Sequence, residues 1–331
     1  MSLALKQIEY MSLEQGAKQT TCTILMIEPV SFGFNEETAS NNYFQQKDTS
    51  SASEVQLRGL DEFKNMLEKL QTVGIDIIAV RDTSEPHTPD SVFPNNWISF
   101  HTDGRVAIYP MYAKNRRAER RMDIVPKLQQ LGFKVSNLVD YTSYEEQHRF
   151  LEGTGSMVLD HENKIAYAAI SERTNKELFL QFCKDFKYKP FHFVASQAVN
   201  GKRLPIYHTN VMMCVADQYC VVCLDTIDKA EERFGMIGSM VKTGKEIIEI
   251  SEEQMHSFAG NMLQVENKEG SRFLIMSQSA YVSLTRPQLE RLMTYNKIIT
   301  IPIPTIEKYG GGSVRCMMAE VFNRKISDEI I

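Results

Sequence analysis

The chain has 331 residues, of which 43% are hydrophobic and 24% are charged, a composition typical of a globular protein with an ample core. Its formal net charge of -5 gives no basic field for nucleic acid or an anionic membrane surface, and no apolar run approaches the roughly 20 residues of a membrane helix. The first residues also lack the basic-then-apolar order of a secretion signal. We expect a cytoplasmic protein with residues 1–20 as a loosely ordered tail and residues 21–331 as one domain, although length alone allows one large or two medium domains. The sequence does not decide between a monomer and a homo-oligomer.

In chain order, runs of alternating or continuous apolar residues predict strands, and amphipathic runs predict helices between them. The N-terminal part gives a strand at 21–29, a helix at 52–74 and a strand at 75–81. Four units of strand, strand, helix and strand follow. Their expected ranges are 95–101, 105–111, 114–132 and 134–140; 155–160, 165–170, 174–186 and 191–196; 211–217, 219–225, 229–241 and 246–251; and 261–267, 272–277, 287–296 and 297–303. A last strand is expected at 313–322.

These segments repeat with a regular spacing. Equivalent points near the first strand of each unit are spaced by 56, 56, 53 and 55 residues and fall at Asn96, Glu152, His208, Asn261 and Cys316. Such a period indicates a repeat or propeller architecture, and the helices between the strands exclude an all-β propeller. We interpret the chain as α/β, a five-bladed pseudo-symmetric propeller of ββαβ units whose last blade is completed by the N-terminal segment. An open α/β sheet is the alternative.

Six cysteines without a secretion signal indicate a reducing compartment. Cys220 and Cys223 form a C-x-x-C pattern, which in other contexts binds metal or carries out redox chemistry. Valine fills and flanks this pair, and no second C-x-x-C follows. We therefore interpret both as buried strand cysteines and expect neither a metal nor an organic cofactor.

In a closed ring, Glu152, His208 and Cys316 would face one central cavity. Cys316 is the candidate nucleophile, because the thiolate is a reactive form and the glycines 310–312 allow the backbone to approach a ligand closely. His208 can protonate a leaving nitrogen and then activate water, and Glu152 can orient its imidazole. Each of the three also has an ordinary interpretation. Cys316 would be a packed, inert thiol, His208 a polar group with its hydrogen bonds satisfied, and Glu152 a solvated loop carboxylate.

Three further polar residues lie near these points. Asn96 and Asn210 occupy loops, where amides commonly form turns. Arg173 follows the sequence AISE and would ordinarily be a surface residue at a helix start, with binding of a carboxylate as the alternative. Residues 81–93 form a loop that either covers the cavity or is a plain connection.

Four ordered motifs, VFPNNWISF, LEGTGSMVLD followed by SERT, YHTNV and GGGSVRCM, resemble those of the guanidino-group modifying enzymes. This pentein superfamily includes arginine deiminases, dimethylarginine hydrolases, succinylarginine dihydrolases and amidinotransferases. The resemblance covers about residues 21–325, and MIEPVSFGFNEETASNNYFQ and FAGNMLQV are most similar to the amidinotransferase-like, citrulline-utilisation hydrolase branch. It implies a five-bladed α/β propeller without a cofactor. It also implies Cys316 as covalent nucleophile, His208 as general acid and base, Glu152 as its partner, and Arg173 at the substrate's α-carboxylate.

The sequence departs from the arginine deiminase pattern at three positions. Those enzymes carry aspartate where this chain has Asn96 and Asn210, and they often carry aspartate where it has Ser156. Two carboxylates suit a cationic guanidinium, whereas an amide can accept from an N–H and donate to a C=O, as a neutral ureido group requires. Succinylarginine dihydrolases act on a guanidinium although they keep Asn at the first of these positions. Asn96 alone therefore says little about the substrate, and Asn96 together with Asn210 says more. With Glu152 as the sole expected counter-charge, arginine is less suitable than citrulline as substrate.

We therefore expect a cysteine-dependent hydrolase that cleaves the terminal C–N bond of citrulline and gives ornithine, ammonia and carbon dioxide. An arginine deiminase or an amidinotransferase, with the same thiolate attacking a guanidinium, is the alternative. A propeller that only binds its ligand is the third hypothesis, because the fold does not by itself require catalysis.

Overall fold

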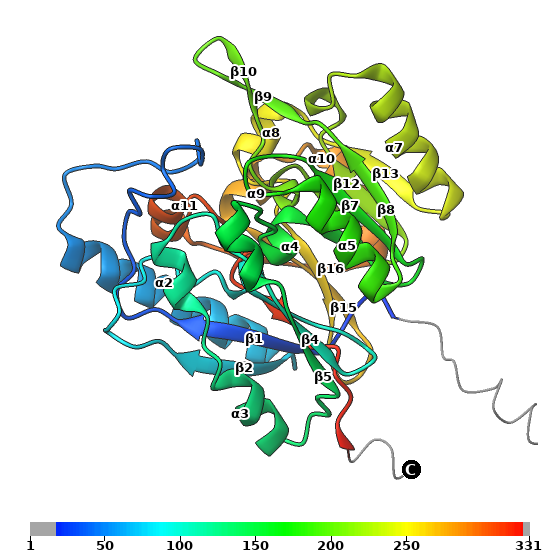
Figure 1. Ribbon diagram of the computed structural model, residues 1–331. Coiled ribbons are helices and arrows are strands. Elements are labelled where there is room, and N and C mark those ends of the chain that lie inside the picture. Colours follow the sequence, from blue (N-terminus) through cyan, green and yellow to red (C-terminus); the bar gives the residue numbers. More distant parts are fainter. Residues whose placement is uncertain (1–17, 327–331) are drawn as a thin grey trace, which may run out of the picture.

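The computed structural model describes residues 18–326. Within them the protein has an α/β fold with five three-stranded sheets and one two-stranded hairpin. In each three-stranded sheet the central strand pairs antiparallel with one neighbour and parallel with the other. Figure 1 shows α3 (Ile124–Gln130) and α7 (Ala230–Lys242) on opposite outer sides of the molecule, with strands between them.

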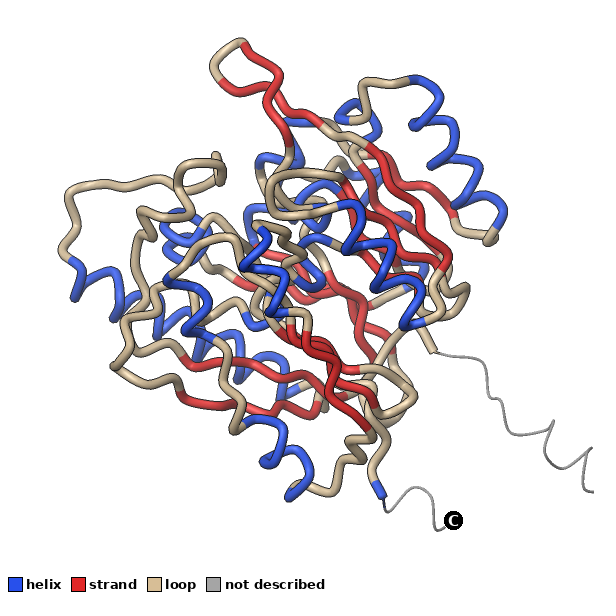
Figure 2. The backbone as a smooth tube through the Cα atoms, viewed as in Figure 1, coloured by secondary structure: helices blue, strands red, loops and turns tan. Residues whose placement is uncertain are grey.

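Four of the sheets follow the predicted units in chain order. They are β3 (Ile98–Phe100), β4 (Arg105–Ile108) and β5 (Asn137–Asp140); β6 (Val158–Asp160), β7 (Ile165–Ala169) and β8 (Lys189–Phe193); β11 (Met213–Val215), β12 (Tyr219–Val222) and β13 (Glu246–Glu249); and β14 (Leu263–Glu266), β15 (Arg272–Ser277) and β16 (Lys297–Ile301). The fifth sheet joins the two ends of the chain, because β1 (Thr23–Glu28) lies between β2 (Asp76–Arg81) and β17 (Ala319–Glu320). A hairpin that the sequence did not predict, β9 (Ser196–Val199) with β10 (Lys202–Pro205), projects from the top of the molecule (Figure 2).

The helices fill the connections between strands. The longer ones are α2 (Ala52–Thr72), α5 (Lys176–Phe186), α7 and α10 (Arg286–Tyr295); the shorter ones are α3, α4 (Gly153–Ser156), α6 (Thr209–Met212), α8 (Glu252–His256), α9 (Gln278–Ser283) and α11 (Pro304–Gly310). Four 3-10 turns are η1 (Pro94–Asn96), η2 (Asn115–Glu119), η3 (Thr142–Gln147) and η4 (Leu224–Thr226). None of the helices between residues 18 and 326 combines the length and hydropathy needed to cross a bilayer.

Several predicted elements are wrong in part. The strands expected at 95–101, 155–160 and 211–217 begin later, after η1, α4 and α6. The helix expected at 114–132 is instead η2 followed by α3. Pro126 favours this break, because a residue without an N–H is tolerated in the first turn of a helix, and α3 begins two residues before it. The strand expected at 313–322 is reduced to β17, and the residues before it form turns in which Cys316 donates its backbone N–H to Ser313.

We expected residues 1–20 to form a loosely ordered tail, but residues 18–20 belong to the described fold. Residues 1–17 lie outside the described part. Gln19 is buried and donates to the carbonyl oxygens of Leu159 and Val215 at 3.0 and 3.1 Å. It also accepts the backbone N–H of His161 at 2.8 Å. The segment before β1 therefore ties the second sheet to the third.

The first strands of the sheets lie next to one another in the interior. β6 contacts β11, β11 contacts β14, and β17 contacts β3. The short helix α4 packs against both η1 and α6, which precede β3 and β11. The segments that carry the predicted site residues are thus brought together by the packing of these strands.

Candidate active site

Glycines allow η1, α4 and α6 to approach closely. At Gly153, whose φ is +46°, a Cβ atom would lie 2.3 Å from the carbonyl oxygen of Asn95. At Gly155, a Cβ atom would lie 2.3 Å from Nδ2 of Asn96 and 2.8 Å from Nδ1 of His208. Side chains larger than hydrogen therefore cannot occupy these positions without displacing two of the predicted site residues.

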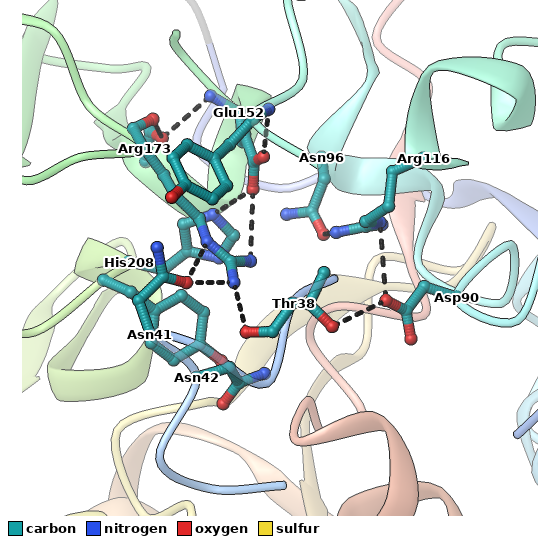
Figure 3. A network of polar contacts seen from close by, with 12 residues as sticks. Thr38, Asn41, Asn42, Asp90, Asn96, Arg116, Glu152, Arg173 and His208 are labelled. Atoms are coloured by element: carbon teal, nitrogen blue, oxygen red, sulfur yellow. Dashed lines mark hydrogen bonds and ion pairs between the residues drawn. The ribbon is translucent and has the colours of Figure 1, made fainter. Parts of the chain in front are cut away.

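His208 and Glu152 form a buried pair, as the sequence predicted. Nε2 of His208 lies 2.7 Å from Oε2 of Glu152, and Oε1 of Glu152 accepts the backbone N–H of Tyr112 at 2.9 Å (Figure 3). Burial opposes the charge of Glu152, but the Arg173 guanidinium and the hydrogen bond from His208 together lower the pKa of Glu152 to about 2. Burial lowers the pKa of His208 to about 4 although Glu152 acts in the opposite direction. At neutral pH the pair is therefore a carboxylate beside a neutral imidazole.

Arg173 lies on the other side of Glu152. Its Nη1 is 3.6 Å from Oε2 of Glu152, and its Nη2 donates to the backbone carbonyl of Thr38 at 3.0 Å. Nε and Nη2 also donate to Oδ1 of Asn41, and the guanidinium lies 4.8 Å from the centre of the Tyr207 ring. The donors of Arg173 are thus engaged by protein groups, and its binding of a substrate carboxylate stays a prediction.

Cys316 lies in a buried turn, directly after the glycines that the sequence singled out. Cβ atoms at Gly310 and Gly312 would lie 2.7 and 3.0 Å from the ring of Phe93, and Gly311 has a φ of +61°. The glycines therefore serve close packing of the backbone against Phe93. The Cys316 sulfur is contacted by the amide Nδ2 atoms of Asn210 at 3.6 Å and Asn261 at 3.3 Å.

One small cavity connects most of these residues. Its volume is about 10 Å³, and it is lined by Thr38, Asn42, Asp90, Phe93, Asn96, Arg116, Arg173, Tyr207, His208, residues 310–312 and Cys316. The nucleophile and the base predicted from the sequence thus face the same space. This volume holds about one water molecule, so the cavity in this conformation is too small for an amino acid. The loop at 81–93 contributes Asp90 and Phe93 to the wall.

Asp90 and Arg116 are site residues that the sequence reasoning missed. Arg116 forms a buried pair with Glu119 through Nε and Nη2, each at 2.9 Å, and its Nε lies 3.7 Å from Oδ2 of Asp90. Burial raises the pKa of Asp90, while the Arg116 charge opposes that rise. The expectation that Glu152 is the sole counter-charge for a cationic substrate is therefore wrong. Arg116 was hidden inside a predicted helix, whereas Asp90 stands two residues before the start of the VFPNN motif and could have been considered with it.

Three polar atoms at the site have no hydrogen-bond partner among the described residues: Oδ1 of Asp90, Nδ2 of Asn96 and Oδ1 of Asn210. The amide of Asn96 is oriented by Arg116, whose Nη1 donates to its Oδ1 at 3.0 Å. The amide of Asn210 is oriented by its Nδ2 contact to Cys316. Buried unpartnered polar groups are costly and rare. Asp90 and Asn96 line the cavity, and Asn210 contacts the sulfur of Cys316 in its wall.

The part of the chain that the structure describes contains no cluster of three or more His, Cys, Asp or Glu side chains suited to a metal ion. Cys220 and Cys223 are both fully buried in or beside β12, as expected. Burial raises the pKa of both thiols.

Comparison with known proteins relates this geometry to a family. The model of a family described as N,N dimethylarginine dimethylhydrolase, eukaryotic, matches residues 28–323. No curated protein sequence matches the chain.

Solved structures share the fold at low sequence identity. Apo ArgZ, an arginine dihydrolase from the ornithine-ammonia cycle in cyanobacteria, has a TM-score of 0.68 at 17% identity, covering 92% of this chain and 41% of that chain. A mutant of AgrE in complex with L-arginine has a TM-score of 0.67 at 16% identity, covering 90% of this chain and 40% of that chain. A mutant of DDAH from Pseudomonas aeruginosa in complex with citrulline has a TM-score of 0.61 at 16% identity, covering 91% of this chain and 99% of that chain. This chain thus spans about two fifths of the ArgZ and AgrE chains and nearly all of the DDAH chain.

The family match extends over most of the described residues, including Glu152, His208 and Cys316. The chain therefore belongs to the N,N-dimethylarginine dimethylhydrolase family, hydrolases of C–N bonds within the pentein superfamily of guanidino-group modifying enzymes.

Proposed function

We propose that the protein hydrolyses the terminal C–N bond of citrulline and releases ornithine, ammonia and carbon dioxide. The observation that carries this proposal is the pair of unpartnered amide atoms, the donor Nδ2 of Asn96 and the acceptor Oδ1 of Asn210. A ureido group has a carbonyl oxygen to accept from the first and N–H groups to donate to the second. A guanidinium has no acceptor atom and would leave the Asn96 donor unpaired.

In this mechanism Cys316 is the nucleophile. Neutral His208 takes the thiol proton, and the buried carboxylate of Glu152, 2.7 Å from Nε2, stabilises the imidazolium that forms. The sulfur then bonds to the ureido carbon, and His208 gives its proton to the departing ornithine nitrogen as the C–N bond breaks. The product is a carbamoyl thioester. His208 next takes a proton from water, whose oxygen bonds to the thioester carbon as the C–S bond breaks. The departing Cys316 thiolate takes the proton back from His208, and the released carbamic acid decomposes to ammonia and carbon dioxide.

A second candidate substrate is a cationic guanidino amino acid such as arginine or a methylated arginine. It is supported by Oδ1 of Asp90, a buried carboxylate oxygen without a partner that could accept from a cationic group. The same oxygen is also suited to the α-ammonium group of citrulline. Asp90 therefore keeps the second candidate open without distinguishing it from the first.

The proposal includes an architecture. We infer that the five sheets are the blades of a closed propeller and that residues 21–331 form one catalytic domain. The pairing of β1 with β17 and the contacts between neighbouring first strands support this inference.

The test is turnover by the purified protein and its Cys316→Ala variant. Each is incubated with citrulline, arginine and dimethylarginine, and ornithine, citrulline and ammonia are quantified. We expect the wild type to release ornithine and ammonia from citrulline and the variant to release neither while keeping its thermal unfolding transition. A matched control is Cys183→Ala, since Cys183 is a buried thiol of α5 that packs in a separate hydrophobic cluster. Near-normal activity of the Cys316→Ala variant would falsify the mechanism, and preference for arginine would favour the second candidate.

A further inference from the structure

Asn261 occupies the equivalent point of the fourth unit and is held rigidly there. It is buried, with 1% of its surface exposed, and lies two residues before β14. The preceding residue, Gly260, packs so tightly that a Cβ atom would lie 2.3 Å from the carbonyl oxygen of Val211 in α6. The backbone of this segment is therefore fixed against the helix that follows His208.

The orientation of the Asn261 amide is set by the backbone around it. Its Oδ1 accepts the backbone N–H of Arg315 at 3.1 Å, and its Nδ2 donates to the backbone carbonyl of Asn210 at 3.0 Å. Rotating the amide by half a turn would place a donor against a donor and an acceptor against an acceptor. The amide can therefore adopt only one orientation without losing both bonds.

In that orientation the second N–H of Nδ2 is available to Cys316. The Nδ2–Sγ distance is 3.3 Å, whereas Oδ1 of the same amide lies 3.7 Å from Sγ. The shorter contact is the one in which sulfur accepts, which a thiolate does more strongly than a thiol. Nδ2 of Asn210, at 3.6 Å, is a second donor to the same sulfur.

We propose that Asn261 is a positioning residue of this enzyme, which holds the sulfur of Cys316 at the cavity wall and stabilises its thiolate by hydrogen bonding. This inference rests on the proposed role of Cys316 as the nucleophile. It assigns a function to the unit that supplied none of the predicted site residues. Each of the five units then contributes at least one residue to the site, and the equivalent points are Asn96, Glu152, His208, Asn261 and Cys316.

The charged and titratable groups that share the cavity with Cys316 come from several elements. They are Asp90, Arg116, Arg173, Tyr207 and His208. Because Asn261 carries no charge, replacing it by leucine leaves all of them in place and removes the N–H donor. A change in thiolate formation would then report on the hydrogen bond to sulfur.

The experiment measures the rate of alkylation of Cys316 by iodoacetamide as a function of pH, with the labelled site identified by mass spectrometry. We expect the pH of half-maximal rate to rise by about one to two units in Asn261→Leu, the effect of losing a hydrogen bond to a charged group. Asn261→Asp should raise it as well, because this variant keeps the acceptor for Arg315 and places a negative charge beside the sulfur. The matched control is Asn296→Leu, which removes a buried amide bonded to Tyr219 and the Leu292 carbonyl. We expect no shift in this control.

A folded Asn261→Leu or Asn261→Asp protein with an unchanged profile would overturn the inference, and if Asn261→Leu does not fold, Asn261→Asp alone decides it. In kinetics with citrulline, the acidic limb of kcat/KM should move by the same amount. The two proposals fail separately. Activity in Cys316→Ala refutes the mechanism, whereas an inactive Cys316→Ala combined with an unshifted alkylation profile refutes only the role of Asn261.

Discussion

Asn96 and Asn210 each leave one end of their amide without a partner, and neighbouring residues determine which end. Arg116 occupies the oxygen of Asn96, and Cys316 occupies the nitrogen of Asn210. The free atoms are therefore one donor and one acceptor. A neutral ureido group satisfies both, and this match is the residue-scale basis for expecting citrulline as substrate.

Replacing both amides by carboxylates should reverse the preference. In the double variant Asn96→Asp with Asn210→Asp, two acceptors face the substrate, and a guanidinium supplies donors for both. We expect the ratio of kcat/KM for arginine to that for citrulline to rise by about 10- to 100-fold, the range for hydrogen bonds to charged groups. Asn323→Asp, at a buried amide that bonds the carbonyls of Gly104 and Lys134, is the control and should leave the ratio unchanged. An unaltered ratio in the double variant would remove the charge argument.

The buried imidazole of His208 makes stability depend on pH. Its pKa is about 4 in the folded protein against an ordinary value of 6.5, so the unfolded chain binds the proton first as pH falls. Stability from this group is present above pH 6.5 and is lost toward pH 4. Between pH 6.5 and 4.5 we expect the unfolding free energy of the wild type, relative to His208→Gln, to fall by about 1–2 kcal/mol. Urea denaturation at several pH values measures this difference. A flat curve for His208→Gln would contradict the argument.

At the scale of elements, the site depends on the short helix α4 between η1 and α6. Its glycines bring the carbonyl of Asn95 and the side chains of Asn96 and His208 within contact distance. Helices of one turn are not stable alone, so α4 takes its position from packing against its neighbours. The glycines of the EGTG motif are therefore needed for the geometry of the site.

A methyl group at Gly155 should disturb catalysis more than folding. We expect Gly155→Ala to lower kcat/KM by about 100-fold, because reacting groups displaced by about 1 Å lose rates of this order. The matched control is Gly238→Ala in the exposed face of α7, where a Cβ atom meets nothing within 4 Å. That change should raise stability by about 0.5–1 kcal/mol and leave activity intact. Wild-type kinetics in a folded Gly155→Ala protein would show that the close approach is dispensable.

At the scale of the whole molecule, side chains link neighbouring sheets. Nζ of Lys245, just before β13, lies 3.4 Å from Oδ2 of Asp160 at the end of β6, and both side chains are fully buried. Lys245 also donates to the carbonyl oxygens of Ala216 and Asp217 at 2.8 and 2.9 Å. This ion pair joins the second sheet to the third. Gln19 links the same two sheets through its hydrogen bonds to the carbonyl oxygens of Leu159 and Val215.

Breaking this ion pair from one side should be costly. We expect Lys245→Met to lower the unfolding free energy by about 3–5 kcal/mol, because Asp160 is left as a buried charge without its partner. Chemical denaturation gives the value. The double variant Lys245→Met with Asp160→Leu should recover part of the loss, since an apolar pair carries no buried charge. If the single and double variants are equally destabilised, the loss comes from packing and not from the charge.

The sequence by itself placed Glu152, His208 and Cys316 in one cavity only on the assumption of a closed ring. It predicted directly the succession of strand–strand–helix–strand units and the period of about 55 residues. These features follow from apolar periodicity and from regular spacing, which are local properties of the chain. The helix at 114–132 and the strand at 313–322 were predicted wrongly in part, because Pro126 and the turn at Cys316 override the apolar pattern. Only the tertiary structure added Asp90 and Arg116 to the cavity and decided which end of each amide is free. Hydrogen bonds between residues distant in sequence control these features, and no local pattern records such bonds.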